Sequence, residues 1–206
     1  MNTKKLAFAI MMGALGNVLF LVSFYTGQIA QGIALDLSLL GVFIAGLYGG
    51  PLTGLIAGLI AGVLPGVMFG PLGSGGVLGL IGLPVGKALT GLTIGLLAKG
   101  LKLQHITRQS LITAPITLLA YLPEGIFTFV YFSILLPLFS GNGIMPMAII
   151  VTILLKAVGE VIVMSVIMAA LAGNTGFRDF VTARFTGMKK KKTSTQNISV
   201  NAEAFS

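Results

Sequence analysis

Four charged side chains interrupt long apolar stretches of this sequence, and they are the residues most capable of chemistry. Lys87 and Lys156 fall near the middle of such stretches, and Glu124 and Glu160 lie inside two of them. A charge at the centre of a bilayer costs from about 2.5 kcal/mol upward, so these groups should face the protein interior or water and have partners. Lys156 and Glu160 are four residues apart, which puts both on one face of a helix.

Two interpretations of these charges remain open. In one, the two lysines and two glutamates neutralise each other in buried ion pairs that set the register of the helices. In the other, some of them line a polar cavity, open to the outside, that binds a small charged or zwitterionic ligand. Lys87 and Lys156 would suit a carboxylate of that ligand, and Glu124 or Glu160 would suit an amine. Because apolar packing usually joins helices at lower cost than buried ion pairs do, the second interpretation is favoured.

Three further residues are candidates for the same cavity. Tyr121 and Tyr131 flank Glu124 and are placed to supply hydroxyls or ring faces, although a tyrosine in such a position more often anchors the interface or fills the core. Asp36 precedes an apolar stretch on the expected outer side, where it either belongs to a lid over the cavity or is a solvated loop acid. Pro123, directly before Glu124, should loosen the helix there.

The composition excludes a soluble domain and offers little to an enzyme. The 206 residues are 55% hydrophobic and 9% charged, with a mean hydropathy of +1.01. With no cysteine and a single histidine, His105, the chain has no thiolate, cysteine metal site or histidine pair. Serine-hydrolase, zinc-protease and phosphate-loop motifs are missing too. We therefore expect no catalytic residue, metal site or cofactor, and any uphill transport must draw its energy from a partner or an ion gradient.

Six apolar stretches predict an all-α integral membrane protein, a bundle of six transmembrane helices within residues 1–176. A hydrocarbon core of about 30 Å requires about 20 helical residues, and the second stretch is short for a span. A cleaved signal peptide is the rival interpretation of the first stretch, but its apolar region usually has only about 7 to 15 residues. The expected helices cover residues 6–25, 37–49, 51–69, 77–98, 110–139 and 147–172. Residues 177–206 are expected to be a basic, disordered tail.

The positive charges predict the orientation of the bundle. Eleven of the thirteen lysines and arginines fall at the N-terminus, in the connector after the fourth stretch, or in the tail, and the connectors on the opposite side have none. By the positive-inside rule both termini are cytoplasmic, in a multi-pass protein of the cell membrane. The lysine run 189–192 is then a solvated segment near anionic lipid, and nucleic acid is not an expected partner.

Glycine recurs at every fourth position in GLYGGPLTGLIAGLIAGVLPGVMFG, residues 46–70. In a bilayer such residues form a surface for close helix packing. A four-residue step drifts by about 40° on an α-helix, so the glycines should wind round the helix and admit more than one neighbour. Pro51, after Gly49 and Gly50, suits the first turn of a helix, which predicts two helices meeting at a tight turn.

Several of these features together resemble the substrate-binding S component of energy-coupling factor (ECF) transporters, the vitamin-uptake branch of the ABC transporters. They are the six-helix length, the segment LYGGPLTGLIAGLIAG, the stretch KALTGLTIGLLAK from Lys87 to Lys99, and a lysine-led first helix with Ala9 and Gly13. The family carries Ala-x-x-x-Ala on that helix, which faces the coupling protein, and Ala9-x-x-x-Gly13 is the nearest match here.

The resemblance implies a function and its partners. An S component binds a vitamin or another small nutrient from outside, using the outward parts of helices four to six closed by the connector between helices one and two. Import is driven by a membrane coupling (T) protein and two ABC ATPases, and Ala9 and Gly13 would dock the former.

Two other classes stay open. One is a self-sufficient, proton-coupled secondary carrier that uses Glu124 or Glu160 as its proton site. The other is a membrane sensor or scaffold whose glycines bind a partner's helix, against which the short tail argues.

Overall fold

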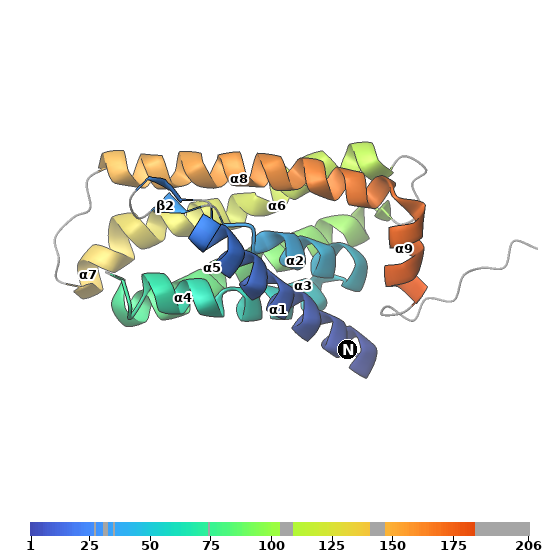
Figure 1. Cartoon of the computed structure of the whole chain (residues 1–206), viewed down its shortest axis with the longest axis horizontal. Coiled ribbons are helices and arrows are strands. Elements are labelled where there is room, and N and C mark those ends of the chain that lie inside the picture. The colour runs from blue at the N-terminus through green and yellow to red at the C-terminus, as the bar shows by residue number, and fades with distance from the viewer. Residues whose placement is uncertain are drawn as a thin grey trace, which may run out of the picture.

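Helices make up nearly all of the described chain. The computed structural model describes residues 1–26, 28–30, 33–34, 36–73, 75–103, 109–140 and 147–183. Most helices run along one long axis, with α1 crossing obliquely and α9 turned across one end (Figure 1). The elements in chain order are α1 (Thr3–Thr26), the antiparallel pair β1 (Gln28–Ala30) and β2 (Ile33–Ala34), α2 (Leu39–Ile44), the π-helical segment η1 (Ala45–Gly49), α3 (Pro51–Ala61), α4 (Val63–Phe69), α5 (Gly76–Gly100), α6 (Gln109–Val130), the π-helical segment η3 (Tyr131–Leu135), α7 (Leu136–Ser140), α8 (Met147–Gly173) and α9 (Thr175–Val181).

Five helical stretches are long and apolar enough to cross a membrane: Thr3–Thr26, Pro51–Phe69, Gly76–Gly100, Gln109–Phe139 and Met147–Gly173. The helix expected over residues 37–49 is instead a short apolar one, Leu39–Gly49. Its six α-helical and five π-helical residues extend about 16 Å at 1.5 Å per residue, about half a hydrocarbon core. A helical chain with five potential spans is therefore confirmed, whereas a sixth full span and cytoplasmic termini stay predictions.

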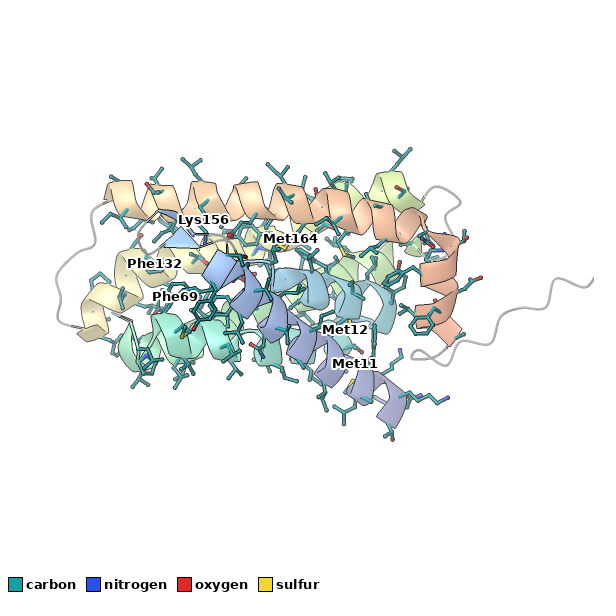
Figure 2. All side chains as sticks on the ribbon, viewed as in Figure 1. Met11, Met12, Phe69, Phe132, Lys156 and Met164 are labelled. Atoms are coloured by element: carbon teal, nitrogen blue, oxygen red, sulfur yellow. The ribbon has the colours of Figure 1, made fainter. Side chains whose placement is uncertain are left out.

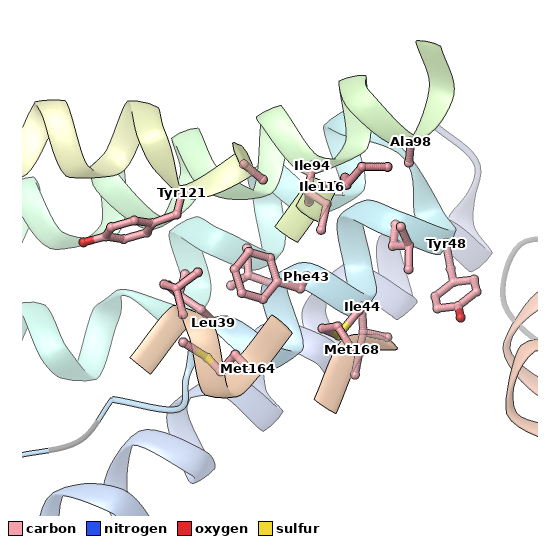
Figure 3. Packing of buried hydrophobic residues seen from close by; sticks show 14 of the residues in the cluster. Leu39, Phe43, Ile44, Tyr48, Ile94, Ala98, Ile116, Tyr121, Met164 and Met168 are labelled. Carbon is pink, nitrogen blue, oxygen red and sulfur yellow. The ribbon is translucent and has the colours of Figure 1, made fainter. Parts of the chain in front are cut away.

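The short helix lies inside the bundle rather than against lipid. Every residue of α2 and η1 except Leu40 is buried, and α2 contacts α1, α3, α5 and α8. In Figure 3 the Phe43 ring lies between Ile94 of α5 and Met164 of α8, with Ile44 close to Met168. Because neighbouring helices enclose it, this segment need not be as long as a membrane is thick. The connector between α1 and α2 can therefore end inside the bundle.

The recurring glycines pack against a single neighbour, α5, and not against several as their drift predicts. A Cβ on Gly54 would overlap the carbonyl of Gly91, one on Gly58 the carbonyl of Lys87, and one on Gly62 the backbone of Pro84. The residue numbers in these pairs increase along α3 while they decrease along α5. The row of glycines on α3 therefore stays against α5 from one pair to the next. A helix that packs along the i, i+4 row of α3 remains in contact with each glycine of that row, so the drift of the glycines round α3 does not require a second neighbour.

The tight turn before α3 is where the sequence places it. Gly50 adopts φ +93°, a conformation that L side chains rarely accept, and Pro51 is the first residue of α3. The turn sends the chain back along η1, which lets α3 meet both η1 and α5.

The third predicted helix is divided at Gly62 into α3 and α4. Pro65 has no N–H to donate to the carbonyl of Ala61, the last residue of α3. Asn17 of α1 supports the break, since its side-chain amide donates to the Ile60 carbonyl over 2.7 Å and its side-chain oxygen accepts from the Leu64 N–H over 3.2 Å. Asn17 therefore joins α1 to the interruption between α3 and α4.

The outer surface of the bundle is apolar. Leu155, Val163 and Val166 of α8 are 69%, 55% and 64% exposed, and Leu122 and Ile126 of α6 are 57% and 66% exposed. Figure 2 shows such side chains projecting from the outer edge of α8 along its whole length. An apolar exterior over helices of this length is what a lipid environment requires.

The tail begins later than the sequence predicts, because residues 175–181 form α9. Asn174 caps this helix by accepting from the Phe177 N–H, and Phe177 packs edge-on against the Tyr48 ring with 6.0 Å between centroids. Arg178 donates to the Gln109 side-chain oxygen over 3.1 Å, and Val181 is buried. Residues 177–183 therefore belong to the folded domain, and the lysine run lies outside the described residues.

Candidate functional site

A buried ion pair joins the segment before α2 to the middle of α5. Lys87 Nζ lies 2.6 Å from Asp36 Oδ2 and 2.6 Å from Ser38 Oγ. Lys87 is 2% exposed and Ser38 is fully buried, so the ammonium group is removed from lipid and water alike. The shortness of α2 makes this pair possible, because Asp36, two residues before the N-cap of α2, lies beside the middle of α5.

Asp36 is held by three elements at once. Besides binding Lys87, its carboxylate accepts from the Ser38 N–H over 2.9 Å, and its own N–H donates to Glu160 Oε1 over 2.5 Å. Burial alone would raise the pKa of Asp36, but the charge and hydrogen bonds of Lys87 and Ser38 outweigh that effect and lower it. Asp36 is therefore an ionised partner in the interior and not the solvated loop acid that one interpretation allows.

Glu124 of α6 faces the same part of α5. Its Oε2 accepts the Thr90 hydroxyl hydrogen over 2.5 Å, and the side chain is 8% exposed. Gly86 lies beside it, and a Cβ there would be in ordinary contact with Glu124 Cγ at 3.4 Å. Lys87 is close enough for its charge to act on Glu124, although the two form no direct ion pair.

The pair expected on one face of α8 is present. Lys156 Nζ lies 3.2 Å from Glu160 Oε1, with 20% of the lysine side chain and 7% of the glutamate side chain exposed. Because Glu160 also accepts from Asp36, the α8 pair is linked to the Lys87 pair through one backbone N–H.

We name the five charged residues Asp36, Lys87, Glu124, Lys156 and Glu160 the ionic cluster. They come from the connector, α5, α6 and α8; ion pairs and a hydrogen bond join four of them, and Glu124 bonds to Thr90, three residues after Lys87. The cluster holds three carboxylates and two ammonium groups. Glu124 is the carboxylate without a cation of its own among the described residues, because Thr90 offers it only a hydroxyl.

The two candidate tyrosines differ in their relation to the cluster. Tyr121 is 8% exposed and lies where the charges of Glu124, Glu160 and Asp36 reach it. Tyr131 is the first residue of η3, two turns beyond Glu124, and its ring lies against the Gly82 backbone of α5. Its hydroxyl is buried and has no hydrogen-bond partner among the described residues.

Tyr131, with Gly82, Gly86 and Glu124, therefore forms a strip between α5 and α6. Tyr131 also begins η3, and wide helical turns of this kind are frequent at functional sites. An unpaired buried hydroxyl in such a strip is the kind of group that a polar ligand satisfies.

The two residues expected to dock a partner lie inside the protein. Ala9 is fully buried, and a Cβ on Gly13 would lie 2.6 Å from Ile60 Cβ of α3. The small-residue face of α1 is therefore used for packing within the chain. The exposed face of α1 carries Ile10 and Val18, which are 49% and 55% exposed.

Ser38 and Thr90 are members of the site that sequence reasoning missed. Thr90 lies three residues after Lys87, so a hydroxyl on the same helical face as a buried lysine was the available signal. Ser38 offered none, because its burial depends on how deep the connector runs. His105 lies outside the described residues, and within the described ranges no group of three or more His, Cys, Asp or Glu is placed to hold a metal ion.

Comparison with protein-family models, with curated proteins and with solved structures finds no match to this chain.

Proposed function

We propose that this chain binds a small nutrient bearing both a carboxylate and an amine, and that it serves as the S component of an ECF transporter, with import driven by a membrane coupling protein and two ABC ATPases. The observation that supports binding is the ionic cluster, in which groups from four separate elements meet in the interior. Helices that needed only to be held together would reach comparable stability with apolar contacts.

The excess of carboxylates supports the choice of ligand. Three carboxylates against two ammonium groups leave Glu124 as a place for one more positive charge, which a ligand amine would supply. The Tyr131 hydroxyl offers a polar contact along the same strip. A ligand amine would thus neutralise the remaining carboxylate of the cluster. A buried charge is favourable only when it is paired in this way.

Asp36 supports an exchange mechanism. Its carboxylate occupies the position at Lys87 that a ligand carboxylate would take. If the ligand displaces it, Lys87 keeps an anionic partner throughout, and no step leaves a buried ammonium group unpaired. Withdrawal of Asp36 would also break its N–H bond to Glu160, so binding would be transmitted to α8.

The test begins with gently solubilised membranes of the native host, from which the tagged protein is purified and its companions are identified by mass spectrometry. Recovery of two ABC ATPases and a membrane coupling protein is the expected result. Recovery of the protein alone, in a detergent that preserves such complexes, would contradict the S-component role.

A separate measurement tests the binding site. The purified protein is screened with vitamins and amino acids for thermal stabilisation, and the hit is then titrated against the Lys156→Met variant. Binding should weaken at least tenfold while the melting temperature without ligand changes little, because the Lys156 side chain is 20% exposed and is the more exposed partner of its ion pair. Equal loss of folding and binding would favour ion pairs that only set helix register. Lys4→Met, an exposed lysine outside the cluster, is the matched control.

A proton-coupled secondary carrier is the second candidate, and Glu124 is the residue that favours it. A buried carboxylate without a cationic partner is suited to take up a proton. Uptake into proteoliposomes that contain this chain, a pH gradient and no ATPase, abolished by Glu124→Gln, would establish the carrier and overturn the S-component proposal.

A further inference from the structure

A second polar site lies at the end of the bundle where α1 begins, and no residue of the ionic cluster lines it. A cavity of about 490 Å³ opens there between the start of α1, the turn from η1 to α3, and the end of α5. Small-molecule sites in proteins have volumes of about 300–1,000 Å³. The cavity therefore has room for a ligand or a lipid head group.

The charge on this cavity has one sign. Lys5, Lys99 and Lys102 line it, and among the described residues no aspartate or glutamate does. None of the three lysines has an ion-pair partner among the described residues. The first turn of α3, at Leu52 and Thr53, forms another part of the lining, and the positive end of the helix dipole lies there. An anion placed here is near lysines of α1, of α5 and of the turn after α5.

The backbone at the end of α5 contributes to this arrangement. Lys102 has φ +49°, and it is the only residue other than glycine with a positive φ among those described. A residue with positive φ after the end of a helix is usually glycine. Gly100 lies two positions before Lys102 but does not have a positive φ. A lysine held in an unfavourable conformation beside a cavity points to a role for its side chain.

The rim of the cavity is apolar where it meets the outer surface. Leu52 lines the cavity and is 59% exposed, on a helix that is long and apolar enough to span a membrane when α3 and α4 are taken together. A soluble anion would gain nothing from this leucine, whereas the acyl chain of a lipid would pack against it. Basic pockets between transmembrane helices bind anionic head groups in this way.

We propose that this cavity binds the phosphate head group of an anionic phospholipid through Lys5, Lys99 and Lys102, with Leu52 against its acyl chain. The proposal does not depend on the nutrient-binding function. A lipid bound here would bridge α1 and α5, since its head group contacts lysines on both.

The experiment uses the full chain in nanodiscs of phosphatidylcholine, with and without phosphatidylglycerol, and counts retained lipids by native mass spectrometry. The expected result is selective retention of phosphatidylglycerol. At about 1 kcal/mol for each lysine, Lys5→Gln should lower the affinity about fivefold and the Lys99→Gln/Lys102→Gln double variant about 25-fold. All three side chains are at least partly exposed, so these variants should fold.

Lys4→Gln is the matched control, because it removes the same charge from the adjacent residue of α1, which does not line the cavity. Equal losses in Lys4→Gln and Lys5→Gln would mean diffuse attraction to the surface and would overturn the site, as would equal retention of the two lipids. A second arm adds inorganic phosphate to the protein in detergent. Lysine-dependent stabilisation by phosphate equal to that by phosphatidylglycerol would make a soluble phosphate the ligand and overturn the lipid.

Discussion

Replacement of Lys87 by methionine should cost this protein more stability than replacement of its partner Asp36 by asparagine. Lys87 is 2% exposed and is the ammonium group nearest to two carboxylates, Asp36 directly and Glu124 through space. Lys87→Met leaves three carboxylates in the ionic cluster with Lys156 as their only ammonium group. Asp36→Asn leaves two carboxylates and two ammonium groups, and asparagine still offers an oxygen to Lys87.

The magnitudes follow from this imbalance. Removal of one partner from a buried pair costs about 3–5 kcal/mol, which we expect for Lys87→Met. A hydrogen bond to a charged group contributes about 1.5–3 kcal/mol, part of which asparagine retains, so Asp36→Asn should cost about 1–2 kcal/mol. The double variant should cost about 1–3 kcal/mol less than the sum of the two single variants, because it leaves neither residue of the pair as a buried charge without its partner.

The assay is the free energy of unfolding in mixed micelles, titrated with sodium dodecyl sulfate and followed by far-ultraviolet circular dichroism. Lys4→Met, an exposed lysine outside the cluster, is the control and should change stability by less than about 0.5 kcal/mol. If Asp36→Asn costs as much as Lys87→Met, or if the two effects simply add, the ionic cluster is not the coupled unit described above.

Two further substitutions examine the packing and the candidate strip in the same unfolding assay. Gly54→Ala should destabilise by about 1–3 kcal/mol, because its Cβ would overlap the Gly91 carbonyl, while Gly159→Ala on the exposed face of α8, whose Cβ meets nothing within 4 Å, should not; equal effects would refute the α3–α5 contact. Tyr131→Phe removes a buried hydroxyl that has no partner among the described residues, so stability without ligand should be unchanged or higher while affinity for the nutrient falls, and a loss of more than about 1 kcal/mol would show that the hydroxyl is paired after all.

The membrane class and most helices could be predicted because they depend on local properties. Apolar length marks the five potential spans, and glycine followed by proline marks the turn at Gly50. The ion pair of Lys156 with Glu160 was predictable for the same reason, since four residues on one helix bring two side chains together in any surroundings. The convergence of the charged residues was also predictable in outline, because lipid forces each of them inward.

Three features depended on neighbours that no local pattern specifies. The drift of the glycines suggested several partners, but a crossing α5 follows them from Gly54 to Gly62. The face of Ala9 and Gly13 is well suited to contact another helix, and the sequence does not say whether that helix belongs to this chain or to a partner. In this structure α3 packs against that face of α1.

The sequence by itself therefore determined that the chain is helical, with stretches long and apolar enough to span a membrane, and that charges within those stretches must find partners, because an unpaired charge in apolar surroundings is costly whatever the fold. Only the tertiary structure decided which partners they find. Enclosure of the short segment Leu39–Gly49 carries Asp36 down to Lys87 and places its N–H on Glu160. The position of a connector depends on whether the helix after it must be long enough to cross a bilayer. Here other helices enclose Leu39–Gly49, so that helix can be short.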